Sequence, residues 1–155
     1  MRIITATGTV DETGPLTRIV NDYCETHARL ASSGASTPEE WAPWAEFVDT
    51  ANFKRVGAYL EELDWHQYLQ FIIDWAGGTK FEMTVFHVTE VGDTVFQEIE
   101  ERHYHGDTFI RKNVMAVYRF NADNKIRHLD IYEQATDSGQ WIKEAASSAM
   151  ETGGG

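Results

Sequence analysis

Four consecutive segments between residues 80 and 134 alternate apolar and polar side chains, and short turns join them. The segments are KFEMTVFHVTEV, TVFQEIEERHYH, TFIRKNVMAVYRF and KIRHLDIYEQ, and the turns contain Gly92-Asp93, Gly106-Asp107 and NADN. Alternation with a period of two is typical of strands, and Gly-Asp or Asn-rich turns between such segments predict hairpins. The second half of the chain is therefore predicted to be an antiparallel meander of four strands.

The first half carries helical patterns that can cover one face of this sheet. Apolar residues recur at three- and four-residue spacing from Pro15 to Leu30, and SSGAS ends that pattern. Thr37-Pro38 begins a short helix through WAPWAEFV, NFKRVGAYLEEL reads as one or two short strands bent at Gly57, and WHQYLQFIIDWAGG is a further helix. This order predicts an α+β layer fold. We expect a flexible N-terminus at 1–14, one domain at 15–145 and a flexible tail at 146–155.

The composition excludes several classes of partner. Asp and Glu number 25 against 13 Lys and Arg, giving a net charge of −12 that repels nucleic acid and anionic membranes. Cys24 is the one cysteine, so neither an intrachain disulfide nor a cysteine-based zinc site can form. The N-terminal sequence lacks the apolar core of a secretory signal, and we expect a cytoplasmic protein.

Alternation assigns an inner, more apolar face to three of the strands. The inner side chains are Val95, Gln97, Ile99, Glu101 and His103, then Ile110, Lys112, Val114, Ala116 and Tyr118, and finally Leu129, Ile131 and Glu133. A charge on a buried face must be paired or must change its protonation state. The polar groups either lie at strand ends near solvent or converge in one pocket, and the pocket is the more economical solution.

The stretch EERHYH, residues 100–105, is open to two interpretations. A zinc or iron site needs Glu101, His103 and His105 to converge, but His105 adjoins the turn where the strand ends. Acid–base chemistry needs only an inward acid, a proton partner and a cation, here Glu101, His103 and Arg55 or Lys112. We expect acid–base chemistry with no metal and no cofactor. Burial is expected to raise the pKa of Glu101, and pairing with Arg55 or Lys112 to restrain that rise.

The order of elements over residues 15–135 resembles the nuclear transport factor 2-like superfamily. The segment most like it is the strand ending Tyr118-Arg119-Phe120, followed by a turn, Lys125-Ile126 and an aromatic residue. The superfamily includes ketosteroid isomerases, limonene-epoxide hydrolases, scytalone dehydratases and polyketide cyclases. The resemblance implies a cone, in which a strongly curved antiparallel sheet and three to four N-terminal helices enclose an apolar cavity. It also implies a homodimer through the convex sheet face.

The resemblance carries over only part of two known catalytic sets. Tyr23 matches the first-helix tyrosine of ketosteroid isomerases, but Arg55 and Ala116 stand where their two acids would lie. Glu101 matches one aspartate of the epoxide hydrolases, whereas Ile99 and Ile131 stand at their arginine and second aspartate. Neither mechanism is therefore expected unchanged.

We expect a cofactor-independent lyase or isomerase that acts on a small hydrophobic, aromatic substrate by elimination or retro-aldol-like cleavage. An example is the loss of water or formaldehyde from a lignin-derived diaryl compound, a reaction that the resemblance suggests. The alternatives are a hydrolase with a carboxylate-activated water and a non-catalytic binding module. The expected catalytic residues are Glu101, Arg55, Tyr23, His103 and Lys112, and the expected substrate-binding residues are Trp44, Phe53, Tyr59, Ile99, Val114, Ala116, Leu129, Ile131 and Glu133.

Overall fold

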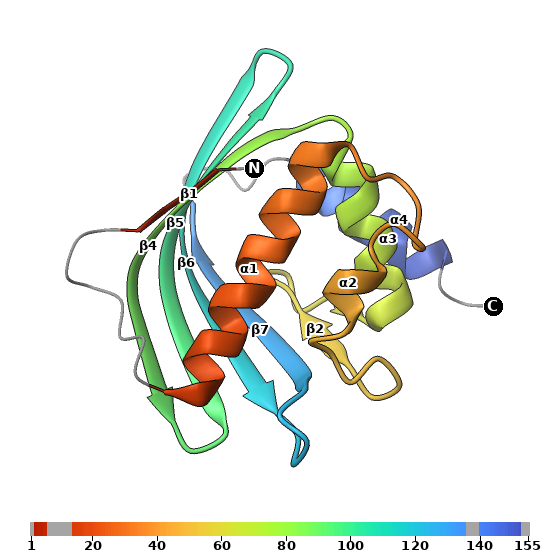
Figure 1. Cartoon of the computed structure of the whole chain (residues 1–155). Helices are drawn as coiled ribbons and strands as arrows, with labels where there is room; N and C mark the ends of the chain where they lie inside the picture. Colours follow the sequence, from red (N-terminus) through yellow and green to blue (C-terminus); the bar gives the residue numbers. More distant parts are fainter. Residues whose placement is uncertain (1, 6–13, 136–139, 153–155) are drawn as a thin grey trace.

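The computed structural model describes residues 2–5, 14–135 and 140–152. A curved sheet wraps around its helices, and the long helix α1 crosses the concave side (Figure 1). The elements in chain order are β1 (Arg2–Thr5), α1 (Pro15–Ser33), α2 (Ala42–Ala45), β2 (Lys54–Val56), β3 (Glu62–Leu63), α3 (Trp65–Ala76), β4 (Lys80–Val91), β5 (Thr94–His105), β6 (Thr108–Phe120), β7 (Ile126–Gln134) and α4 (Gln140–Thr152).

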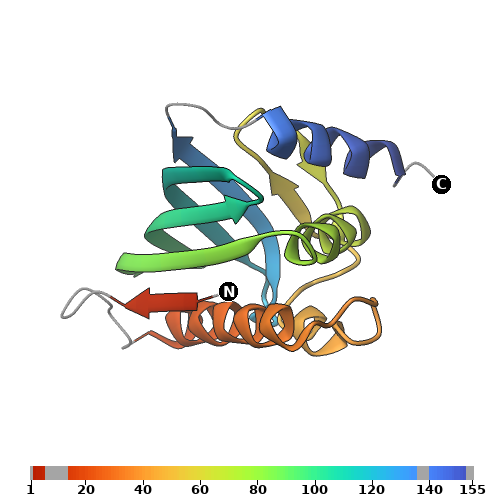
Figure 2. The same ribbon diagram turned by 90° about the horizontal axis from the view of Figure 1, so that it is seen from above.

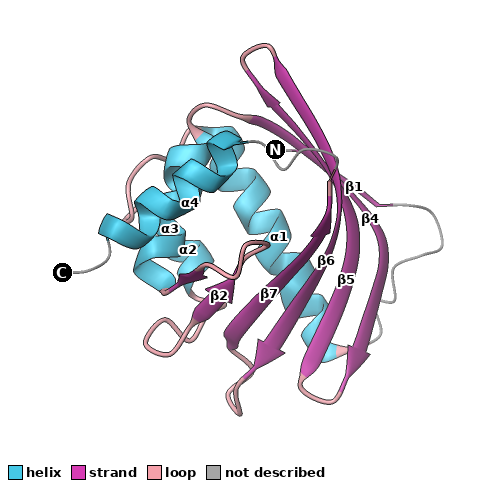
Figure 3. Ribbon diagram, turned by 180° about the vertical axis from the view of Figure 1, so that it is seen from behind, coloured by secondary structure: helices cyan, strands magenta, loops and turns pink. Residues whose placement is uncertain are grey.

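Within the described part of the chain, the sheet has seven strands in the order β1-β4-β5-β6-β7-β2-β3. Strands β4 to β7 form the predicted antiparallel meander, β1 joins its outer edge parallel to β4, and β2 joins the other edge parallel to β7. Figure 3 shows the helices gathered on one side of this sheet. The predicted α+β cone is therefore confirmed. No helix in the described part of the chain is long and apolar enough to span a membrane.

The local sequence explains where the helices begin and end. Gly34 adopts a left-handed conformation at φ 79° and ends α1, a conformation that glycine enters without a steric cost. At the start of α3, the Asp64 side chain accepts a hydrogen bond from the Gln67 backbone, and the Gln67 side chain accepts one from the Asp64 backbone. This capping box satisfies backbone donors that the first helical turn leaves open. It fixes the start of a helix that faces the cavity.

The register of the meander confirms the predicted inner faces. Glu101 lies directly opposite Lys112 across β5 and β6, and Ala116 lies opposite Ile131 across β6 and β7. On the inner face of β6, every predicted residue from Ile110 to Tyr118 is buried. Because side chains two residues apart share a face, the strands bring their isolated polar groups to one side of the sheet.

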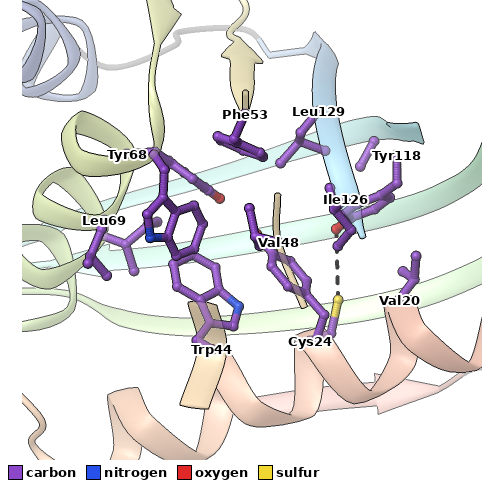
Figure 4. Packing of buried hydrophobic residues seen from close by; sticks show 14 of the residues in the cluster. Val20, Cys24, Trp44, Val48, Phe53, Tyr68, Leu69, Tyr118, Ile126 and Leu129 are labelled. Carbon is purple, nitrogen blue, oxygen red and sulfur yellow. Dashed lines mark hydrogen bonds between the residues drawn. The ribbon is translucent and has the colours of Figure 1, made fainter. Parts of the chain in front are cut away.

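Aromatic rings fill the space between the sheet and the helices. Trp44, which is fully buried, stacks on Tyr23 of α1 with ring centroids 4.9 Å apart, and lies 4.9 Å from Trp65 and 5.5 Å from Tyr68 of α3. Figure 4 shows Trp44 and Tyr68 in this buried cluster, with Cys24 beneath Tyr118. The cluster ties α1, α2 and α3 together, and each ring contact adds roughly 1 kcal/mol beyond burial.

Three features differ from the sequence prediction. Residues 140–152 form α4, with Ala146 and Ala149 buried, although a flexible tail was predicted from residue 146. Strand β1 pairs with β4 within the predicted flexible N-terminus, of which residues 6–13 lie outside the described residues. Helix α2 covers only four residues, Ala42–Ala45.

The convex face of the sheet exposes Phe96 and Tyr132, and the homodimer through this face stays a prediction.

The capping box gives a prediction for stability. Replacing Asp64 with alanine removes the side-chain acceptor at the start of α3 and should lower the free energy of unfolding by about 1 kcal/mol. Urea denaturation measures this change. Asp22→Ala, at an exposed position within α1, is the matched control and should change stability by less than about 0.5 kcal/mol. Equal effects of the two substitutions would contradict the capping role.

Candidate active site

A cavity of about 110 Å³ lies between the concave sheet face, α1 and α3. The sheet supplies one wall and the helices supply the other. In the view from above, α1 and α4 lie on opposite sides of α3 (Figure 2). Nine of the predicted site residues line the cavity: Tyr23, Arg55, Ile99, Glu101, His103, Lys112, Ala116, Leu129 and Ile131. The predicted convergence of the inner-face groups is therefore present in the structure.

A network of charged side chains crosses three strands in the cavity wall. Glu101 Oε2 lies 2.8 Å from Nε2 of His103 and 3.8 Å from Nζ of Lys112. Lys112 Nζ also donates a hydrogen bond of 2.8 Å to Glu133 on β7. The Lys112 and Glu133 side chains are only 8% and 7% exposed, so each charge is neutralised by a buried partner.

Arg55 shares the cavity but does not form the expected ion pair with Glu101. The ion pair that its guanidinium forms is with Glu61, from Nη1 to Oε1 at 3.6 Å. Its Cζ lies 5.2 Å from the ring centroid of Tyr68 and 5.7 Å from that of Phe71, where cation–π attraction holds it. Among the described residues, Arg55 Nε and Nη1 are buried and have no hydrogen-bond partner. The guanidinium is therefore held in place, and its Nε and Nη1 groups can still donate hydrogen bonds to a ligand.

The predicted rise in the pKa of Glu101 is wrong. Burial does raise this pKa, but the hydrogen bond with His103 and the charges of Lys112, His103 and Arg55 outweigh it, and the pKa falls from 4.5 to about 2. The prediction counted the cost of burial and one cation. The structure places a histidine and two cations around the same carboxylate, which stays ionised at neutral pH.

Uncharged polar groups line the α1 side of the cavity. Tyr118 donates a hydrogen bond of 3.3 Å to Gln97 Oε1, and Gln97 Nε2 lies 3.5 Å from Cys24 Sγ. Burial, and then the neighbouring Tyr68, raises the pKa of Tyr23 well above its usual value, so its hydroxyl keeps its proton. Burial lowers the pKa of His27 to about 4, which leaves this imidazole neutral at pH 7. These side chains can donate or accept hydrogen bonds without adding charge.

Five predicted substrate-binding residues do not line the cavity. Trp44 and Phe53 are packed into the aromatic core, and Val114 is buried in the core at the sheet. Tyr59 is 40% exposed on a loop. Glu133 accepts a hydrogen bond from Lys112, which does line the cavity. Lining residues outside the predicted set are Cys24, His27, Tyr68, Phe71, Ile72, Trp75, Phe81, Met83, Gln97 and Tyr118. Alternation already placed Gln97 and Tyr118 on inner faces and was the signal that could have found them.

His105 does not join the other two residues of the metal interpretation. Its Nδ1 lies 3.2 Å from Thr79 Oγ1, and its ring lies in a groove outside the cavity. His103 instead packs inside against Trp75 and Phe81, at centroid distances of 5.3 Å and 4.8 Å. His103 therefore lines the cavity and His105 lines the groove, a separation that the turn next to His105 indicated.

Comparison with known proteins identifies the fold and leaves the reaction open. No protein-family model matches the chain, and no curated protein matches it. A solved NTF2-like protein of unknown function from Exiguobacterium sp. 255-15 has a TM-score of 0.58 at 15% identity, covering 75% of this chain and 98% of that one. The epoxide hydrolase/cyclase-like enzyme SalBIII of salinomycin pyran-ring formation has a TM-score of 0.61 at 12% identity, covering 79% and 92%.

A SnoaL-like polyketide cyclase from Jannaschia sp. CCS1 is similar at a TM-score of 0.56 and 16% identity, with 80% of this chain and 91% of that chain covered. At these identities the likeness concerns the fold. The chain therefore has the nuclear transport factor 2-like fold, which confirms the resemblance seen in the sequence. Solved proteins with this fold include cyclase-like and epoxide hydrolase-like enzymes alongside proteins of unknown function.

The low pKa of Glu101 predicts how stability depends on pH. Because this carboxyl is ionised at lower pH in the folded chain than in the unfolded chain, its contribution is complete above about pH 4.5 and is lost as the pH falls toward about 2. The shift corresponds to on the order of 3 kcal/mol. Glu101→Gln should lower stability at neutral pH and flatten its decline in this acid window, as measured by urea denaturation at several pH values.

Glu98→Gln is the matched control, because the Glu98 side chain is 52% exposed on the other face of the same strand. This control should leave the acid dependence close to that of the unsubstituted chain. If Glu101→Gln showed the same acid dependence as the unsubstituted chain, the proposed network around this carboxylate would be wrong.

Proposed function

We propose that the chain is a cofactor-independent lyase or isomerase that performs acid–base chemistry on a small hydrophobic, aromatic substrate in this cavity. One observation carries the proposal. Buried polar atoms of Tyr23, His27 and Arg55 have no well-formed hydrogen bond within the described residues, and all three side chains line the cavity beside the Glu101–His103 pair. Unsatisfied buried donors are rare, and their gathering at one hollow indicates that a ligand completes them.

His103 is proposed to move the proton, with Glu101 as its positioning partner. A carboxylate with a pKa of about 2 is a weak base at neutral pH, so direct proton abstraction by Glu101 is disfavoured. The same carboxylate fixes the orientation of the imidazole through the 2.8 Å contact. Lys112 and Glu133 hold Glu101 in place from the neighbouring strands.

Arg55 and Tyr23 are proposed to stabilise the negative charge that proton removal creates. In an elimination or isomerisation, the imidazole takes a proton from a carbon next to a carbonyl or activated ring, and the electron pair moves onto the oxygen. Donors already fixed at that oxygen lower the barrier without having to reorganise. The proton then returns to another carbon, or it joins a leaving hydroxyl that departs as water.

Release of formaldehyde follows the same scheme with a different bond. The imidazole takes the proton of a hydroxymethyl group, the carbon–carbon bond breaks, and its electron pair moves onto the same stabilised oxygen. Formaldehyde leaves as the neutral product, and His103 delivers the proton to the carbon whose bond to the hydroxymethyl group was broken. Both reactions need an oxygen acceptor on the substrate at Arg55.

The charges around the cavity favour an uncharged substrate. The carboxylates Glu61, Glu101 and Glu133 face the cations Arg55 and Lys112, so the set carries one negative charge when His103 is neutral. An anionic ligand would add repulsion in a site where charges are poorly screened. A neutral ring with a carbonyl or hydroxyl oxygen fits the free donors and the aromatic walls.

A hydrolase remains the second candidate. The ionised Glu101 carboxylate could orient a water molecule, and SalBIII, which has a similar fold, is described as epoxide hydrolase/cyclase-like. Reaction in oxygen-18 water separates the two. A lyase or isomerase product carries no label at a newly formed hydroxyl, whereas a hydrolase product does. Ligand binding with no turnover of any candidate substrate would instead support a non-catalytic binding module.

Substitution of the proposed groups gives the activity test. His103→Gln should reduce kcat by at least about a hundredfold, because it removes the proton carrier, and Arg55→Gln should reduce kcat through loss of the oxyanion donor. Arg111→Gln, whose side chain is 62% exposed, is the matched control and should retain full activity. Circular dichroism confirms that each variant folds. Unchanged kcat in both cavity variants would overturn the proposal.

A further inference from the structure

A second hollow lies outside the cavity, in a groove of about 610 Å³ between α3, α4 and the start of β4. Of the residues that the structure describes, the groove and the cavity share Phe71 and Trp75, which stand one turn apart on α3. The two hollows therefore adjoin, and these two rings are the wall between them.

The dividing rings contact the groups proposed to act on the substrate. The Phe71 ring lies 5.7 Å from Cζ of Arg55, and the Trp75 ring centroid lies 5.3 Å from that of His103. Both rings are only partly buried. A molecule that extends past Phe71 and Trp75 would thus have one end at the proposed reacting groups and the other end in the groove.

The volume of the cavity is too small to hold more than a small part of a larger substrate. A hollow of about 150 Å³ takes up one benzene molecule, and the present cavity is smaller than that. The groove is several times larger. The inner cavity therefore holds at most one ring, and any second ring needs the groove.

We propose that the groove is a second binding subsite, which holds the outer, hydroxylated ring of a two-ring substrate. This inference rests on the proposed function for the inner cavity. Hydrogen-bonding side chains of Gln70, Asp74 and Thr79 line one part of the groove, and Ser148 and Thr152 line the side of α4. Among the described residues that line the groove, Asp74 is the one Asp, Glu, Lys or Arg, so this part of the groove favours a neutral hydroxyl group over an anion.

The small residues of α4 leave the space that this ring would fill. Ala145, Ser148 and Ala149 face the groove, and a larger side chain at Ser148 would occupy it. Ser148 is exposed and Gln70 lies on the opposite wall, so each can be enlarged without changing the inner cavity. Glu151, also exposed on α4, does not line the groove and gives a matched control.

The test compares p-cresol, which has one ring, with bisphenol F, which has two hydroxylated rings, by isothermal titration calorimetry. The unsubstituted chain should bind bisphenol F at least about tenfold more tightly than p-cresol. Ser148→Phe and Gln70→Phe should each remove most of this advantage and leave p-cresol binding unchanged. Glu151→Phe should leave both affinities unchanged.

Equal affinity for the two compounds, failure of both to bind, or an equal loss in Glu151→Phe would overturn the inference. The outcome is separable from that of the proposed function. Selective two-ring binding with no effect of His103→Gln on any turnover would reject the proposed chemistry and keep the subsite. Turnover of one-ring compounds with no advantage for two rings would reject the subsite and keep the chemistry.

Discussion

The ionic network centred on Lys112 is the interaction on which the rest of the site depends. Lys112 is a buried ammonium group between two carboxylates, Glu101 on one neighbouring strand and Glu133 on the other. Its position follows from the register, because Glu101 is directly opposite it in the β5–β6 pair and Glu133 is opposite Val114, two residues along β6 and on the same face. A slip of one residue would move these charges to the other face of the sheet. The register that buries the apolar core therefore also assembles the charged wall.

The curvature of the sheet gives this wall its low-polarity surroundings. The concave face is closed by α1 and α3, which the aromatic cluster around Trp44 joins. Arg55 comes from β2, which pairs with β7 beside Leu129, so the same sheet presents a second cation from the strand next to β7. Rings of α3 pack against this guanidinium and hold it where its unused donors reach the cavity. Fold and candidate chemistry are thus built from the same contacts.

Much of the fold and part of the site could be predicted from the sequence. Alternation in β5 to β7 is a local signal, and it correctly placed Glu101, His103 and Lys112 on one face. The contribution of α3 could not be predicted in this way, because periodicity shows that Tyr68 and Trp75 are apolar neighbours but does not show which way the helix turns toward the sheet. Trp44 and Phe53 were predicted to bind substrate but pack in the core, because large aromatic residues are found in a core as well as at a cavity.

The errors in the predicted pKa of Glu101 and in the predicted ion pair of Arg55 also arise because the sequence does not show which side chains meet in the tertiary structure. The pKa of Glu101 depends on the number of partners within a few ångströms, and only the register and packing reveal that His103 and Lys112 both reach it. The pairing of Arg55 with Glu61 comes from the bend at Gly57, where the backbone Gly57 N–H donates to Glu61 and closes the turn. The sequence alone indicated the residue types, and their partners emerged from the tertiary structure.

The central claim is that Glu101 is a buried, ionised carboxylate held by His103 and Lys112. Carbon-detected NMR of the Glu101 side-chain carboxyl tests it directly, with assignment by the Glu101→Gln variant. At about pH 3.5, where an unpaired glutamate is mostly protonated, the account predicts that this carbon still resonates at its ionised position. A titration midpoint at or above the usual glutamate value would contradict the account.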